Sequence, residues 1–172
     1  ERLPCPQRRK TKLFEVGRAF FEAELIVNLP KFKTHGLTYV SGAVKNLFGA
    51  MPGMRKSQMH LKFPEGEDFS EFLLDLYSAF LEGFDPPRTL IHIMDGILAM
   101  EGNGPNSGDM RYMGLTFASR SLYAQDYVAA RLMGLVPESV VMLRLALEKG
   151  LLSPEDIELV GDAVQPSDPP FK

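Results

Sequence analysis

The chain has 172 residues, of which 45% are hydrophobic and 24% are charged, values that are ordinary for one globular domain with a substantial core. Its formal net charge is −3, but a basic stretch faces an acidic remainder, which argues against a general nucleic-acid binder. The single cysteine, Cys5, excludes an internal disulfide and the four thiolates of a typical iron–sulfur cluster within these residues.

No targeting or membrane segment is evident in the sequence. It contains no uninterrupted apolar span of about 20 residues, and its start, ERLPCPQRRKTK, lacks the apolar core of a signal peptide. We therefore expect a cytoplasmic protein without membrane contact. The start at Glu1 without methionine suggests a fragment of a longer protein.

Residues 25–64 contain no acidic side chain and carry a formal charge of +6. Two of the three histidines lie in the same window, whereas residues 65–172 carry a formal charge of −11. The basic groups are embedded among glycine, phenylalanine, leucine and methionine, which is typical of a folded site and not of a disordered basic tail. The sequence therefore predicts an anion-facing site in this stretch.

Residues 1–12 are rich in proline and arginine and predict an irregular lead-in, and residues 14–21 fit either a short strand or a turn of helix. Leu25–Leu29 is apolar on both faces apart from Asn28, as in an interior strand that helices cover. We expect a turn over residues 35–38 and a short helix over about 39–48. Pro52 and Gly53 favour a loop over residues 49–59.

Residues 68–81 form the clearest amphipathic helix, because apolar residues recur there at helical spacing. Residues 88–94 predict a second buried strand, residues 101–109 a turn-rich loop, and residues 113–118 a third strand. Helices are expected over 123–133 and 137–149, and a last short strand over 157–160. Strands that alternate with helices predict an α/β fold with a mostly parallel sheet and helices on both faces. We expect residues 1–164 to form a single α/β domain and residues 165–172 to be a linker or tail.

Several runs of residues carry a family resemblance. They are PKFKTH at 30–35, AVKNLFG at 43–49, the spaced Lys56 and His60, DGI at 95–97, MEGNGP at 100–105, Gly108, and DYVAARLMG at 126–134. In these runs the sequence resembles the bacterial and archaeal family known as domain of unknown function 362, over roughly residues 20–161. Two positions depart from the family pattern: Ser121-Leu122 replaces Asp-Pro, and Gln125 replaces an apolar residue.

The resemblance implies that an N-terminal portion, normally another α/β stretch, is missing from this chain. It also implies that the full-length protein carries a ferredoxin-like iron–sulfur module, so that a 4Fe-4S cluster would lie outside these residues and a redox partner is expected. No agreed reaction comes with the family name.

Lys31, Lys33 and His35 alternate, so an extended chain would project their side chains from one face. They follow a strand, and open α/β sheets bind ligands at the carboxyl ends of strands. An ammonium group suits phosphate or carboxylate, and His35 could donate, accept or bind a metal. A solvated strand end is the alternative.

Lys45 and Asn46 lie in the predicted short apolar helix, where an inward charge is costly without a partner. The alternative is that Lys45 points to water and Asn46 caps a turn. Lys56 and His60 are four residues apart and could belong to a mobile lid. All four are expected to bind the ligand.

Asp95, Glu101 and Asn103 are expected to form the opposite wall of the site, with Glu101 and Asn103 as ligand-binding residues. Asp95 and Glu101 are candidate ligands of a divalent metal such as magnesium, but the three side chains could equally pair with the lysines. His92 is expected to be a core histidine, and Asp126 either caps a loop or faces the cleft.

Three functions remain open. The first is a cytoplasmic ligand- or cofactor-binding domain with a basic anion-binding cleft, joined to an iron–sulfur redox module. The second is an enzyme that acts on a small carboxylate or phosphate, with His35 as acid/base and Lys33 as an anion clamp. The third is a non-catalytic interaction module. A small anionic ligand and a homodimer are the expected partners.

Overall fold

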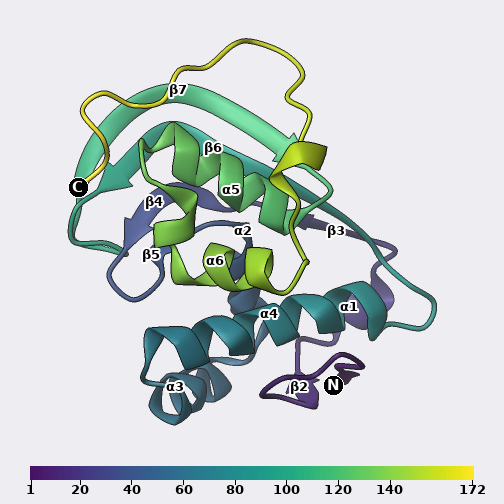
Figure 1. Cartoon of the computed structure of the whole chain (residues 1–172). Helices are drawn as coiled ribbons and strands as arrows, with labels where there is room; N and C mark the ends of the chain where they lie inside the picture. The colour runs from purple at the N-terminus through teal and green to yellow at the C-terminus, as the bar shows by residue number, and fades with distance from the viewer.

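The longest strand, β6 (Thr89–Glu101), lies at the centre of a five-stranded sheet. The first half of β6 pairs in parallel with β3 (Leu25–Asn28), and the second half pairs in parallel with β4 (Lys31–His35). β3 and β4 therefore follow one another along the same side of β6. In this computed structural model of residues 1–172, β7 (Asp109–Ser119) borders the other side of β6 and arches with it over the helices (Figure 1).

The α/β class is confirmed, but the sheet is mixed and only partly parallel. β7 runs antiparallel to β6, and the two strands form a long hairpin through the glycine-rich loop at residues 102–108. The second predicted strand does not end at Met94 but continues through Asp95-Gly96 to Glu101. Gly96 belongs to the strand because it packs against β7, where an added Cβ would lie 2.5 Å from Leu115 Cδ1. A glycine inside a strand permits this close approach.

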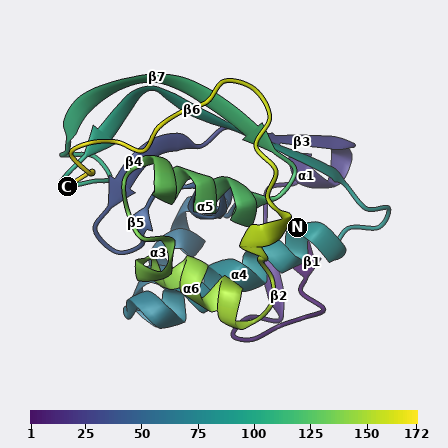
Figure 2. The ribbon, with the colours of Figure 1, turned by 45° about the horizontal axis from the view of Figure 1, so that its top comes forward.

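The helices build the core on one face of the sheet (Figure 2). The amphipathic pattern at residues 68–81 becomes α4 (Gly66–Glu82), whose phenylalanine and leucine side chains are buried, as predicted. α5 (Leu122–Leu132) contacts β6 and β7, and α6 (Val141–Glu148) contacts α4 and α5. The short helix α2 (Ala43–Leu47) packs against β3, α4 and α5.

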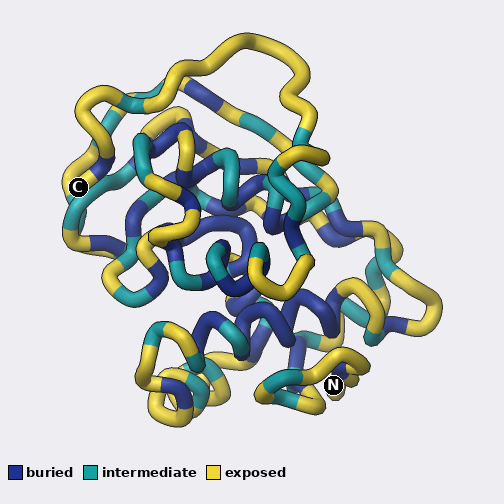
Figure 3. Tube along the Cα trace, viewed as in Figure 1, coloured by how far each residue is buried: buried dark blue, intermediate teal, exposed yellow.

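The opposite face of the sheet is open to solvent. The sequence predicted helices on both faces, but the helices cover only one. Burial alternates along β3: Ile26 and Asn28 are buried, whereas Leu25 and Val27 are 49% and 47% exposed (Figure 3). The exposed apolar side chains of this face and its β6–β7 end are Leu25, Val27, Leu29, Ile93, Ile97, Leu98, Met110 and Tyr112. The apolar sequence pattern indicated burial on both faces, but no helix of these 172 residues packs on the second one. We name this surface the open sheet face.

The first residues are not irregular. β1 (Arg2–Pro4) and β2 (Leu13–Glu15) form an antiparallel pair. The turn between them is held by Asp75, a fully buried carboxylate that accepts hydrogen bonds from three successive backbone N–H groups, at residues 9–11, at 2.6–2.9 Å. α1 (Ala19–Glu22) then leads into β3. A single acidic residue on α4 therefore orders the proline- and arginine-rich lead-in.

Two further segments differ from the sequence prediction. Residues 39–48 divide into β5 (Tyr39–Val40), which forms a hairpin with β4, then α2 and the start of the short 3₁₀ helix η1 (Phe48–Ala50). The predicted loop at 49–59 contains α3 (Gly53–Lys62), because Pro52 occupies the N-cap position in an extended conformation and starts the helix instead of breaking it.

The last third of the chain follows α5 with η2 (Pro137–Ser139), α6 and η3 (Pro154–Asp156). The expected strand at 157–160 does not form. The final residues return to the sheet, where Phe171 is buried against the Phe32 ring at a centroid distance of 5.5 Å. The backbone N–H of Phe171 donates to the Met133 carbonyl at 2.8 Å.

Candidate functional site

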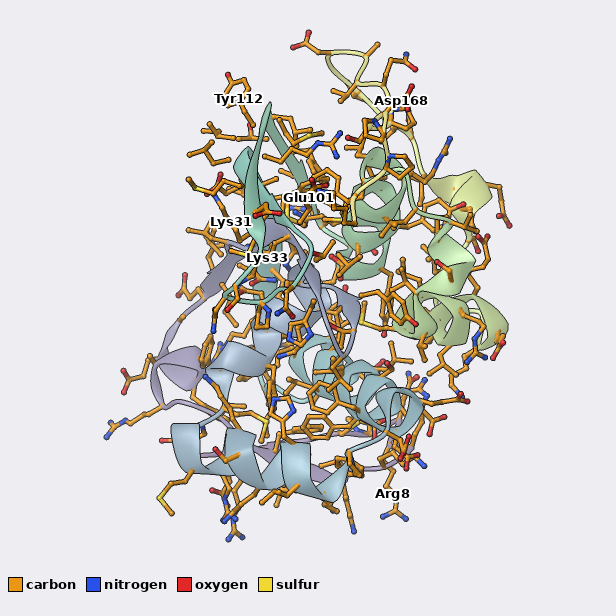
Figure 4. All side chains as sticks on the ribbon, turned by 90° about the vertical axis from the view of Figure 1, so that its left-hand side faces the viewer. Arg8, Lys31, Lys33, Glu101, Tyr112 and Asp168 are labelled. Carbon is orange, nitrogen blue, oxygen red and sulfur yellow. The ribbon has the colours of Figure 1, made fainter.

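A cleft of about 340 Å³ opens between β4, α2 and α3. Seven of the site residues that the sequence predicts, six as ligand-binding and His35 as acid/base, line it, and no acidic side chain does. The lining residues are Leu29, Lys31, Lys33, His35, Ser41, Lys45, Asn46, Phe48, Gly49, Lys56, His60 and Pro105. We name this the basic cleft. Figure 4 labels two of these residues, Lys31 and Lys33, near one another on β4.

The alternation of β4 supplies one wall of the basic cleft. Phe32 and Thr34 are buried in the core, so the strand turns Lys31, Lys33 and His35 to the other side. The Nζ of Lys33 donates to the Pro105 carbonyl at 2.9 Å and thereby links β4 to the glycine-rich loop. The loop therefore closes the cleft through a proline carbonyl.

α2 supplies the second wall, and the buried Asp126 holds its N-terminus. The Asp126 carboxylate accepts hydrogen bonds from the backbone N–H groups of Ala43 and of Val44, the latter at 3.0 Å. Burial raises the pKa of Asp126 to about 7, although these two backbone groups lower it. A Cβ on Gly42 would lie 2.0 Å from Asp126 Oδ1, so only glycine leaves room for this contact. Asp126 therefore positions α2 and does not face the cleft.

Asn46 is held by a hydrogen-bonded chain from β3. Its Nδ2 donates to Asn28 Oδ1 at 2.7 Å, and Asn28 Nδ2 donates to the Ala43 carbonyl at 2.9 Å. Asn28 is buried and lies on the helix side of the sheet. This chain orients α2 against the strand that leads into the cleft.

Lys45 is the least solvated cation of the cleft. Its Nζ lies 4.7 Å from the ring centroid of Phe48 and 5.6 Å from that of Phe69, and it makes no ion pair. Burial lowers the pKa of Lys45 to about 8, and the charges of Lys56 and Lys33 add to this effect. The cation–π contacts favour the ammonium form, but burial and like-charge repulsion outweigh them, because the pKa is lowered.

The two histidines of the cleft stay neutral at pH 7. His35 Nδ1 accepts hydrogen bonds from the backbone N–H groups of Leu37 at 3.1 Å and Thr38 at 3.4 Å, so its proton resides on Nε2. Burial, followed by the Lys45 and Lys33 charges, lowers the pKa of His35 to about 4. Burial and the Lys45 charge also lower the pKa of His60. His35 is thus a neutral hydrogen-bond donor and a weak base.

Asp95, Glu101 and Asn103 are not among the residues that line the basic cleft, although Asp95 contacts one lining residue, Lys31. Asp95 lies mid-strand and pairs with Lys31 Nζ at 2.8 Å, which lowers the pKa of its carboxyl. Glu101 pairs with Arg111 at 3.0 Å, and Asn103 is exposed in the loop. Pro105, in the loop between β6 and β7, lines the cleft in their place.

The donor sets for a metal or a cluster are incomplete. No group of three or more histidine, cysteine, aspartate or glutamate side chains is placed to hold a metal ion. Cys5 is buried with its Sγ donating to the Asp75 carbonyl at 3.3 Å, and burial raises the pKa of its thiol to about 11. One buried thiol does not fit a four-thiolate cluster.

None of the helices combines the length and the apolar character that a membrane-spanning helix requires.

Some residues that shape the cleft were missed by the sequence analysis. Phe48 follows Lys45 by three residues, a spacing that places the two side chains on one face of a helix and could have been noticed. Phe69 comes from α4, and the Phe69 and His60 rings stack at a centroid distance of 4.7 Å. No local pattern connects Phe69 or Pro105 with the basic stretch.

The structure explains how the chain accommodates the two positions that depart from the family pattern. Ser121 is the N-cap of α5, where its side-chain oxygen accepts a hydrogen bond from the Ala124 N–H at 3.2 Å. Serine and aspartate are both good N-caps, so this change keeps the cap. Gln125 is buried against β6, where its amide can donate to the His92 carbonyl at 3.3 Å and accept from the Met94 N–H at 2.9 Å. His92 lies in the core, as predicted, and is fully buried.

The comparisons with known proteins agree with the resemblance seen in the sequence. The family model described as Domain of unknown function (DUF362) matches residues 1–131. A thylakoid-associated protein of Synechocystis is 35% identical over 147 residues, which are 84% of this chain and 43% of that protein. The chain thus spans less than half the length of this relative. No solved structure matches. A family match over most of the chain, together with this relative, shows that the chain belongs to the DUF362 family.

Proposed function

We propose that this chain is a ligand-binding domain that holds a small phosphate- or carboxylate-bearing molecule in the basic cleft. One observation carries the proposal: Lys33, Lys45 and Lys56 line a single cleft that no acidic side chain lines. Ammonium groups gathered in a partly enclosed site repel one another unless an anion compensates them. An anionic ligand supplies that compensation, and the attraction weakens as salt screens it.

The other cleft residues fit the same role. The Nε2–H of neutral His35 is a donor for an anionic oxygen, since its Nδ1 is already used by the backbone. Lys31 is the exception, because Asp95 already neutralises its charge. The ligand is therefore bound by three unpaired lysines and one neutral imidazole.

The enzyme alternative gains less support. A general base works best when its pKa lies near the operating pH, and the pKa of His35 is about 4 because burial and two lysine charges lower it. His35 is better suited to donate a hydrogen bond than to exchange protons at neutral pH. The interaction-module alternative is favoured by one observation, the apolar residues of the open sheet face.

The wider setting of the domain is also a proposal. The family resemblance suggests that longer members join this domain to an iron–sulfur module, and a redox partner would follow from that arrangement. The relative from Synechocystis is thylakoid-associated by its name. The cytoplasmic location expected from the sequence remains a prediction for this chain.

Calorimetric titration of the 172-residue chain with inorganic phosphate tests the proposal. Replacing Lys33 or Lys56 with methionine removes one charge-assisted contact, worth about 1.5–3 kcal/mol, so the affinity is expected to fall about 10- to 100-fold. Lys62→Met is the matched control, because Lys62 is an exposed α3 lysine outside the cleft lining. Absence of phosphate binding, or an equal loss in the Lys62 variant, would overturn the proposal.

A further inference from the structure

The environment of Lys45 differs from that of the lysines that have an ion-pair partner. Lys10, Lys31, Lys149 and Lys172 each pair with a carboxylate, which holds the ammonium form. Lys45 has no such partner, lies over the Phe48 and Phe69 rings, and faces the charges of Lys33 and Lys56. Lysine amines that act as nucleophiles are usually desolvated or placed beside other cations.

Burial and like charge leave a usable fraction of free amine on Lys45. With a pKa of about 8, roughly a tenth of Lys45 is neutral at pH 7, against about one in 3,000 for an ordinary lysine. The free amine, and not the ammonium, attacks a carbonyl carbon. Lys45 can therefore react at neutral pH without an external base.

His60 is the candidate proton carrier for this amine. The His60 ring stacks on Phe69 and meets the Phe48 ring edge-on at 5.3 Å, so His60 and Lys45 rest on the same two aromatic rings. Both side chains line the basic cleft, and the charge of Lys45 lowers the pKa of His60. A neutral imidazole so placed can take the proton released when the amine adds to a carbonyl and return it when water leaves.

We propose that Lys45 forms an imine with an aldehyde or ketone ligand that also carries a phosphate or carboxylate group. The anionic group would be held by Lys33 and Lys56, which brings the carbonyl carbon to Lys45 Nζ. Nitrogen forms a bond to that carbon and gives a carbinolamine, whose hydroxyl leaves with a proton as one molecule of water. Nothing is oxidised or reduced in this step. The inference rests on the proposed function, since it requires the anion to bind in the same cleft.

Reductive trapping with pyridoxal 5′-phosphate, a probe that has both an aldehyde and a phosphate, tests the proposal. The 172-residue chain is incubated with a limiting amount of probe at pH 7, reduced with borohydride, and mapped by peptide mass spectrometry. Lys45 is expected to be modified at least about tenfold faster than Lys62, which also lies over a ring, that of Phe63 at 5.0 Å, but is exposed outside the cleft. Inorganic phosphate is expected to slow labelling of Lys45 and leave that of Lys62 unchanged.

Lys45→Arg separates the two proposals, because arginine retains the cation and forms no imine. This variant is expected to bind inorganic phosphate and to lose the adduct. Phosphate binding by the unmodified chain with no preference for Lys45 over Lys62, or with the adduct on Lys33 or Lys56, refutes imine formation alone. Absence of both phosphate binding and the adduct refutes the proposed function as well.

Discussion

The contact between Gly42 and Asp126 leads to a steric prediction for the helix that carries Lys45. Gly42 is the N-cap of α2, and a Cβ there would lie 2.0 Å from Asp126 Oδ1 and 2.3 Å from Asp126 Cγ. The backbone of Gly42, at a φ of −70°, is open to any residue. The cost of Gly42→Ala therefore comes from this collision and not from backbone strain.

The magnitude follows from what the carboxylate must give up. A glycine-to-alanine change at a compatible position stabilises a protein by about 0.4–1 kcal/mol. At Gly42 the buried carboxylate must instead move away from the N–H groups of Ala43 and Val44. Each hydrogen bond to a charged group contributes about 1.5–3 kcal/mol. We expect Gly42→Ala to lower the free energy of unfolding by about 2–5 kcal/mol.

Urea denaturation followed by circular dichroism measures this change. Gly49→Ala is the matched control, because Gly49 also borders the cleft but has no atom within 4 Å of an added Cβ; its stability is expected to change by less than about 1 kcal/mol. In an Asp126→Ala background the collision is absent, so Gly42→Ala should cost little there. An unchanged urea midpoint for Gly42→Ala, or an equal cost in both backgrounds, refutes the reasoning.

The other predictions concern protonation and self-association. Proton NMR is expected to show His35 neutral down to a pH near its pKa of about 4. Because the unfolded chain takes up this proton near pH 6.5, the free energy of unfolding is expected to fall as the pH is lowered from about 6.5 to about 4. Titration of His35 near pH 6.5 in the folded chain would contradict this. The open sheet face is expected to drive self-association, which Val27→Lys or Ile97→Lys should weaken in sedimentation experiments. Leu61→Lys, on α3 at 83% exposure, is its control, and a wild-type chain that stays monomeric over a wide concentration range would disprove the expectation.

Local pattern was sufficient for the elements that have a strong period or composition. The helical spacing of phenylalanine and leucine predicted α4, and the apolar run before Pro30 predicted β3. The acid-free stretch predicted one anion-facing site with Lys31, Lys33, His35, Lys45 and Asn46, and these residues line one cleft. These features follow from neighbours in the sequence, because the period of a helix or strand decides which side chains share a face.

Local signals misled where a distant segment determines the conformation. Asp95-Gly96 has the composition of a turn, yet pairing with β7 carries β6 through it, and Gly96 allows the approach of Leu115. Pro52 has the composition of a loop, yet it starts α3. In both cases hydrogen-bonded pairing or packing outweighs a weak local preference.

Only the tertiary structure decided which bases remain unpaired and how strongly each is desolvated. Asp95 neutralises Lys31 from 64 residues away, whereas Phe69 of α4 covers Lys45 and Asp126 of α5 holds the helix on which Lys45 lies. Charge and hydropathy along the chain set the sign of the cleft, but the reactivity of one amine depends on the distances to particular rings and carboxylates. Those distances are set by contacts between segments far apart in sequence, because Coulomb attraction and burial act through space and not along the chain.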